Sequence, residues 1–256
     1  HLVSDSMPAQ LLQRGITSLR DPGAWIETYE PARQMDLPLP RLYLTGPHLD
    51  GFPPAYPRNS YIVQDIAEAE RIVERLVDQK ASAIKVYFRL SLDLIRQVCE
   101  TAHEAGIPVT AHLEITDARD AINAGLDGIE HVTSFGTTLL PLREAEHYRQ
   151  AMLTQNKFRR PGRYQVWNQL DTTDAAVREL ANFLVEKETF VCPTLGAFEY
   201  RLSEEKPDTL RHTGFERMLD ITGYLQQQGV RIVVGSHGHI PYADWGWSYQ
   251  REMELM

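Results

Sequence analysis

Seven short runs rich in β-branched residues recur along the chain, and helical patterns separate them. Each run has the length and composition of a strand buried on both faces, as the strands of a parallel sheet are. The runs cover residues 15–21, 41–46, 83–88, 108–113, 128–132, 188–195 and 231–237. This pattern constrains the fold more than any other feature, because buried parallel strands need helical crossovers between them.

Amphipathic helices are predicted in the intervals between these strands. Apolar residues recur at helical spacing over residues 61–80, 92–105, 174–187 and 209–228. Alternating strands and helices predict an α/β fold with a parallel sheet. An eighth strand ending near His1 would complete a (β/α)8 TIM-type barrel, and an open doubly wound sheet is the alternative.

The length of 256 residues suits one such barrel, so residues 1–256 are predicted to form a single domain. The chain opens at His1 rather than at Met and stops at Met256 within a helical pattern. We therefore expect a fragment that lacks the start of strand one and the C-terminal part of its parent protein.

Charge and composition exclude several classes of partner. The chain has 26 Lys and Arg against 35 Asp and Glu, a net charge of −9, so we expect no nucleic-acid or anionic-membrane binding. No run of about 18 apolar residues is present to span a membrane. The two cysteines, Cys99 and Cys192, are too few for a disulfide framework. We expect a soluble protein and favour the cytoplasm, although a signal peptide before His1 would change that location.

Four polar residues lie at the ends of predicted buried strands: Lys85, His112, His131 and His237. Burying such groups without partners costs roughly 2–7 kcal/mol each, so their presence needs an explanation. In a barrel these strand ends meet at one mouth, where imidazole nitrogens and few cysteines favour a metal such as zinc.

Three loops follow strands on the same face and are candidates for lids or specificity elements. They cover residues 47–60, which are rich in proline and aromatic residues, residues 133–171, and the charged residues 196–207. The longest of them contains the basic stretch 157–163.

Several phrases, in this order, resemble the amidohydrolase superfamily, in particular the imidazolonepropionase-like and prolidase-like carboxypeptidase group. They are LLQRGITSLRDPGA (11–24), LYLTGPHL (42–49), AIKVY (83–87), VTAHLE (109–114), GLDGIEHV (125–132) and VVGSH (233–237). The resemblance implies a metal-dependent hydrolase on a (β/α)8 barrel, with one or two divalent ions, most simply zinc.

The resemblance also places the metal ligands. His1 matches the second histidine of the first-strand motif, and Lys85 matches a lysine that bridges two metals as a carbamate. His112 and His131 match the ligands of the second metal.

One position departs from the family pattern. The family carries at the end of strand eight an Asp that acts as general base, and this chain has His237 there. Either His237 takes the proton or binds metal, or Asp244 reaches back into the site, or the site is degenerate.

Three further residues are candidate substrate contacts. Tyr87 and Arg89 share the strand side of Lys85, and Arg89 would grip a carboxylate, while His48 follows strand three. The alternative for each is an exposed or structural side chain. Asp21 and Glu130 are interpreted as structural ion-pair or capping residues.

The predicted function is hydrolysis of a C–N bond in an amide, peptide or cyclic amide by metal-activated water. The substrate would be a small molecule or dipeptide-like compound, and a homo-oligomer is possible. The alternatives are a catalytically impaired barrel fragment, or a lyase in which Lys85 forms a Schiff base.

Overall fold

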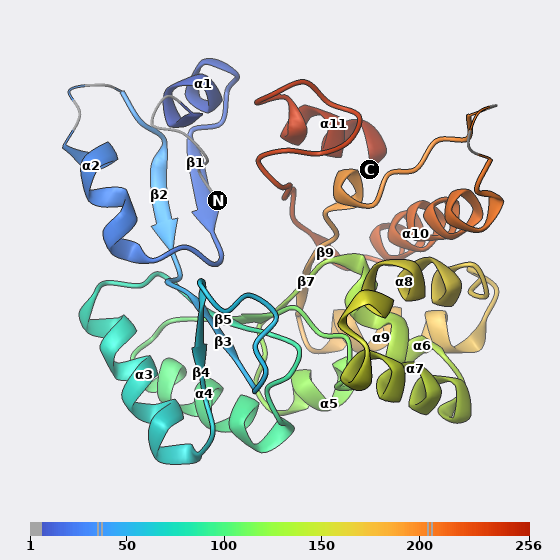
Figure 1. Ribbon diagram of the computed structural model, residues 1–256, viewed down its shortest axis with the longest axis horizontal. Helices are drawn as coiled ribbons and strands as arrows, with labels where there is room; N and C mark the ends of the chain where they lie inside the picture. The colour runs from blue at the N-terminus through green and yellow to red at the C-terminus, as the bar shows by residue number, and fades with distance from the viewer. Residues whose placement is uncertain (1–6, 35, 37, 204, 206) are drawn as a thin grey trace.

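Parallel strands in two sheets form the frame of the computed structural model, which describes residues 7–34, 36, 38–203, 205 and 207–256 (Figure 1). The larger sheet has the order β4-β3-β5-β6-β7-β8-β9, and β1 pairs with β2 in a sheet of two strands. The strands are β1 (Ser18–Asp21), β2 (Arg41–Leu44), β3 (His48–Asp50), β4 (Ser60–Ile62), β5 (Ile84–Val86), β6 (Val109–Ala111), β7 (Gly128–Glu130), β8 (Phe190–Cys192) and β9 (Arg231–Ile232).

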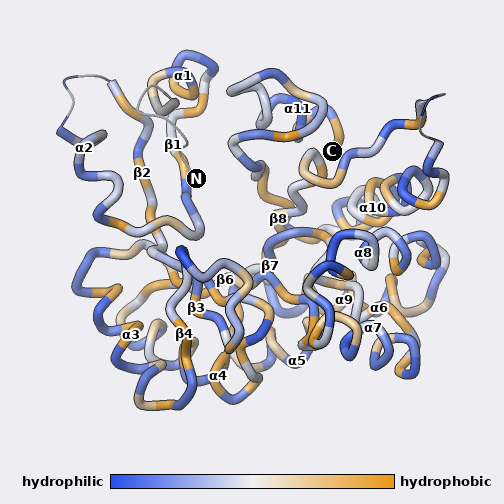
Figure 2. Tube along the Cα trace, in the orientation of Figure 1, coloured by the Kyte–Doolittle hydropathy of each residue, from blue (hydrophilic) through white to orange (hydrophobic). Residues whose placement is uncertain are grey.

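Helices connect the strands and pack against the sheets. They are α1 (Met7–Gln13), α2 (Glu30–Arg33), α3 (Ile66–Asp78), α4 (Leu92–Glu104), α5 (Ala118–Asn123), α6 (Gly136–Leu139), α7 (Leu142–Thr154), α8 (Arg159–Trp167), α9 (Ala175–Glu186), α10 (Thr209–Gln227) and α11 (Ser248–Leu255). The short 3-10 helices are η1 (Ile26–Tyr29), η2 (Val132–Phe135), η3 (Asn156–Phe158) and η4 (Leu195–Ala197). The hydropathy of α3 and α4 alternates along each helix, as expected when one face is buried (Figure 2).

Helix α3 begins later than the sequence pattern predicts, and its first turn explains why. The Asp65 carboxylate accepts a hydrogen bond from the Glu68 amide at 2.8 Å, and the Glu68 carboxylate accepts one from the Gln64 amide at 2.9 Å. This reciprocal capping box fixes the helix start at Ile66. Tyr61, predicted to begin the helix, lies instead in β4.

Two predicted loops contain regular structure, so their description as loops was wrong. Residues 47–60 include β3, which pairs with both β4 and β5. Residues 133–171 are mainly helical and include α6, α7 and α8. Helix α8 buries Val166 and Trp167 in the core, and this burial supplies the stabilisation that a solvated loop would lack.

The sheet order agrees with the predicted parallel α/β fold, and all seven predicted strands are present. Among the described strands, however, β1 pairs with β2 alone and β9 with β8 alone, so strand pairing does not close a ring there. Side chains bridge the two sheets instead: Arg20 on β1 donates to Thr110 on β6 at 3.1 Å and to Glu130 on β7 at 2.5 Å.

The first and last described helices also meet. Tyr249 of α11 packs against the small apolar cluster formed by Leu11 and Leu19. Beside it, the Arg14 guanidinium lies over the Trp247 ring at 4.7 Å, and Gln250 donates to the Arg14 carbonyl at 3.1 Å. The two ends of the described chain are therefore joined by side chains. No helix in the described ranges is long and apolar enough to cross a membrane.

A matched pair of glycine substitutions tests the packing of the chain after β2 against Leu76 of α3. Gly46 has φ +75°, and a Cβ there would lie 2.5 Å from Cδ2 of the buried Leu76, so we expect Gly46→Ala to lower the free energy of unfolding by roughly 1–3 kcal/mol. Gly223 lies inside α10 with nothing within 4 Å of the added Cβ. Gly223→Ala should raise that free energy by about 0.5–1 kcal/mol. Urea unfolding measures both, and a stable Gly46→Ala variant would contradict the packing described.

Candidate functional site

Three imidazoles from different strands lie side by side at the carboxyl ends of the sheet. His112 follows β6, His131 follows β7, and His237 lies beyond β9. The ring centroids of His112 and His131 are 4.4 Å apart, and those of His131 and His237 are 5.5 Å apart. The parallel sheet produces this grouping, because the carboxyl ends of neighbouring strands lie at one edge.

Lys85 lies in the middle of β5 and is 2% exposed. Its Nζ is 4.0 Å from Oε1 of Glu130 and has no hydrogen-bond partner among the described residues. Burial outweighs the attraction of Glu130 and lowers the pKa of Lys85 to about 8. A measurable fraction of this amine is therefore neutral near pH 7.

Glu130 is the buried anion that pairs with the positive charges of Lys85 and Arg20. Burial alone would raise its pKa, but Lys85 and Arg20 outweigh that effect and lower the pKa to about 2. The carboxylate is 3% exposed and stays ionised at all ordinary pH values. Glu130 thus has the structural ion-pair contacts expected from the sequence.

The backbone at His131 adopts a sparsely populated conformation, with φ 67° and ψ 124°. Its Nδ1 lies 2.5 Å from Oγ1 of Thr194, which itself has φ 52°. Such conformations cost roughly 1–3 kcal/mol and persist where surrounding contacts fix them. Burial, together with the charges of neighbouring groups, holds the pKa of His131 well below its usual value.

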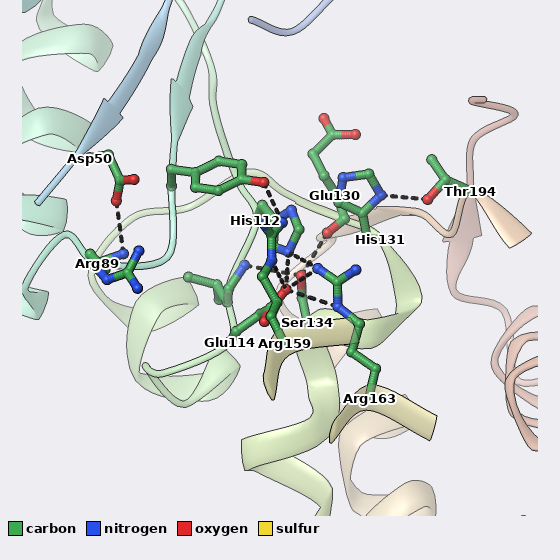
Figure 3. Close-up of polar contacts among 12 residues, drawn as sticks. Asp50, Arg89, His112, Glu114, Glu130, His131, Ser134, Arg159, Arg163 and Thr194 are labelled. Carbon is green, nitrogen blue, oxygen red and sulfur yellow. Dashed lines mark hydrogen bonds and ion pairs between the residues drawn. The ribbon is translucent and has the colours of Figure 1, made fainter. Parts of the chain in front are cut away.

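His112 is buried, and among the described residues its ring makes polar contacts through Nε2 only. This nitrogen lies 2.6 Å from Oε1 of Glu114, whereas Nδ1 has no partner in the described part of the chain (Figure 3). Burial, Arg159 and Arg163 hold the pKa of His112 well below its usual value, so the ring is neutral at pH 7.

Two arginines of α8 contact Glu114, and one of them, Arg163, also contacts His112. The sequence analysis missed both as site residues. Nε of Arg159 and Nε of Arg163 each donate to Oε1 of Glu114 at 3.0 Å, and Nη2 of Arg163 lies 3.2 Å from Nε2 of His112 (Figure 3). Their spacing of four residues in the basic stretch was the available signal, since it places both on one side of a helix. Glu114 lies two residues after His112, so strand alternation points it to the same side.

Two of the three candidate substrate contacts, Tyr87 and His48, lie beside the other imidazoles. The Tyr87 ring is 4.6 Å from that of His48 and 4.7 Å from that of His112, and its hydroxyl accepts from Nη2 of Arg159 at 2.6 Å. Arg89 lies farther out: its amide donates to Asp50 at 3.0 Å and its guanidinium lies 4.5 Å from the Phe88 ring centroid.

The two candidates for the general base differ in position. His237 retains solvent exposure, yet the surrounding protein lowers its pKa to about 4, mainly through desolvation. Asp244 is exposed, and within the described ranges its carboxylate makes no hydrogen bond or ion pair with the imidazoles. The predicted ligand His1 lies outside the described residues.

No group of three His, Cys, Asp or Glu side chains in the described ranges is arranged to hold a metal ion. The donor types nevertheless fit one. Among the described residues, Lys85 Nζ and His112 Nδ1 are buried nitrogens without hydrogen-bond partners, and neutral imidazoles are zinc ligands.

Comparisons with known proteins place this geometry in context. No family model and no curated protein matches the chain. Solved structures do match: bottromycin amidohydrolase at 21% identity and a TM-score of 0.68, covering 98% of this chain and 59% of that one. A Xaa-Pro dipeptidase with bound methionine in its active site matches at 16% identity and a TM-score of 0.62, covering 97% and 61%. A. niger ochratoxinase matches at 17% identity and a TM-score of 0.58, covering 91% and 55%.

These neighbours share the fold of this chain, and two of them are described as an amidohydrolase and a Xaa-Pro dipeptidase. The chain spans about 60% of the length of the structures that it matches.

The buried His48 makes stability depend on pH. Burial is the main cause that lowers the pKa of His48 to about 3, and the charge of Lys85 is the next. Below pH 6.5 the unfolded chain therefore binds a proton at His48, whereas the folded chain does not. This contribution is complete above pH 6.5 and is lost as the pH falls, by roughly 2 kcal/mol at pH 5. We expect His48→Gln to reduce the loss of unfolding free energy between pH 7 and pH 5, measured by urea titration. The exposed His239→Gln is the control, and equal losses in His48→Gln and the parent would contradict the assignment.

Proposed function

We propose that this chain, which has the amidohydrolase fold, is a metal-dependent hydrolase of amide, peptide or cyclic amide bonds in small molecules or dipeptide-like compounds. The observation that supports it is the grouping of His112, His131 and His237 beside the buried amine of Lys85. The charge of Lys85 contributes to the lowered pKa of all three histidines, as expected for groups around one centre.

We infer that His1, Lys85, His112 and His131 hold one or two divalent ions, most simply zinc, with Lys85 present as its carbamate. A lysine must be neutral to react with CO2, and burial supplies this condition by lowering its pKa to about 8. The hydrogen bond that Nδ1 of His131 donates to Oγ1 of Thr194 fixes that ring and leaves Nε2 for a metal. A bound ion of this kind polarises the scissile carbonyl and lowers the pKa of a water molecule toward ~7.

The remaining steps belong to side chains of this chain. We assign proton transfer to His237, with Asp244 as the alternative, because the neutral imidazole of His237 lies next to His131. Tyr87, His48 and Arg89 are assigned to substrate binding. The finer fold proposal is a single (β/α)8 barrel domain over residues 1–256, in which β1 and β9, each paired with one strand in the described chain, would be the first and last of the parallel strands.

Metal loading is the decisive experiment. Elemental analysis of the zinc-reconstituted protein should give one or two ions per chain, and Lys85→Met and His112→Asn should each reduce this number. His147→Asn on the exposed face of α7 is the control. Chelator dialysis should abolish amide or dipeptide hydrolysis, and zinc or manganese should restore it. A borohydride-reduced substrate adduct on Lys85 would contradict hydrolysis and identify the Schiff-base lyase instead.

The base assignment is tested by two variants. His237→Asn should reduce turnover by roughly 10²–10⁴-fold, and His237→Asp should recover part of that loss. The surrounding protein lowers the pKa of His237, mainly through desolvation, so the acid limb of the parent pH–rate profile should lie below the ordinary value of about 6.5. Normal turnover in His237→Asn with an inactive Asp244→Asn would assign the base to Asp244, and no metal-dependent turnover in the parent would identify a degenerate site.

A further inference from the structure

We propose that Glu252 of α11 is a positioning residue for His131, on which it acts through the turn that follows β8. This turn consists of Thr194 and η4, and the Thr194 hydroxyl holds the imidazole. The inference rests on the proposed function for the role of His131 as a metal ligand. It goes further by assigning the side chain that keeps this ligand in place from a different part of the chain.

The Glu252 carboxylate binds two successive backbone amides at the start of η4. Its Oε1 accepts from the Leu195 amide at 2.7 Å, and its Oε2 accepts from the Gly196 amide at 2.8 Å. The first amides of a helix have no partner within the helix, so they need an acceptor from elsewhere. A carboxylate provides one oxygen for each amide, whereas the side chain of Gln has a single acceptor oxygen.

Glu252 is fully buried, and its hydrogen bonds within the described ranges are to these backbone amides. Burial raises the pKa of Glu252 to about 7, and the two hydrogen bonds oppose that rise because they stabilise the charged form. Gly196 leaves room for the carboxylate, since a Cβ there would lie 3.4 Å from Oε2 of Glu252 and 2.7 Å from Cδ1 of Ile240. The start of η4 is therefore packed closely around this carboxylate.

Thr194 precedes the two amides and lies in the left-handed region, with φ 52° and ψ 44°. A β-branched residue rarely adopts this conformation, so surrounding contacts have to hold it. The hydrogen bonds of Glu252 to the next two residues supply part of that constraint. Oγ1 of Thr194 donates to the Pro193 carbonyl at 2.8 Å and accepts from Nδ1 of His131 at 2.5 Å (Figure 3).

The segment after η4 contacts His131 a second time. The Phe198 ring lies edge-on to the imidazole, with the centroids 5.9 Å apart. The neighbouring residue of α11, Arg251, binds the Glu199 carboxylate through Nε at 2.9 Å and Nη2 at 2.8 Å. Two successive residues of α11 therefore hold the turn, and a displacement of the turn would change both of its contacts with His131.

The ring of His131 provides a readout that does not depend on turnover. In metal-free protein with ¹⁵N-labelled histidine, the nitrogen chemical shifts show which ring nitrogen carries the proton, and the spectrum of His131→Gln assigns the signal. The parent should hold this proton on Nδ1, because this nitrogen donates to Thr194. Glu252→Ala removes the acceptor of both amides, so we expect a mixture of the two tautomers.

Zinc affinity provides a second readout, measured by competition with a chromophoric chelator. Glu252→Ala should weaken zinc binding by roughly 10–100-fold, which is the usual effect of removing a group that orients a metal ligand. Glu252→Gln keeps one acceptor oxygen and should lie between the parent and Glu252→Ala in both measurements.

A matched control lies on the same helix. Glu254→Gln changes a carboxylate that is 63% exposed and pairs with Arg251, so it should leave both readouts unchanged. Circular dichroism melting shows whether each variant is folded, and Glu252→Gln is the test variant if Glu252→Ala unfolds.

The outcomes separate this inference from the proposed function. A folded Glu252 variant with an unchanged His131 signal or unchanged zinc affinity would overturn the positioning role, and so would an equal change in Glu254→Gln. A changed tautomer in a protein whose parent form binds no zinc would leave the positioning role standing and refute the proposed function.

Discussion

The ion pairs of the buried Glu130 carboxylate with Arg20 and Lys85 hold the two sheets together. The carboxylate lies between Arg20 of the two-stranded sheet and Lys85 of the larger sheet, so one anion connects both sheets. Removing one member of such a buried set leaves an uncompensated charge, which typically costs 3–5 kcal/mol. The same arrangement lets a lysine lie inside the sheet at all. Glu130 stabilises the charged form of the Lys85 amine, whereas burial disfavours that form and lowers the pKa.

Charge in this molecule is separated by position. The chain as a whole is acidic, with a net charge of −9, whereas the carboxyl ends of the strands collect Lys85, Arg159 and Arg163. A low-dielectric wall around such a cluster focuses its field toward the opening.

Sequence patterns predicted those parts of the fold that local residue spacing determines. All seven β-branched runs contain a strand. Burial on both faces explains the apolar runs of β5, β6 and β7, whereas β1, β2 and β9 keep exposed residues. Strands β3 and β4 were missed since proline and aromatic residues around them are typical of loops, and their pairing depends on distant β5. Lys85 and His112 were identifiable as polar residues in apolar runs. Arg159 and Arg163 were missed, because their four-residue spacing points to a site only when tertiary packing places the buried Glu114 opposite them.

The arginines that contact Glu114 also affect the protonation of His112. The positive charges of Arg159 and Arg163 help to keep His112 unprotonated, which is the form that ligates a metal. Helix α8, which supplies both arginines, therefore acts on His112 through their positive charge.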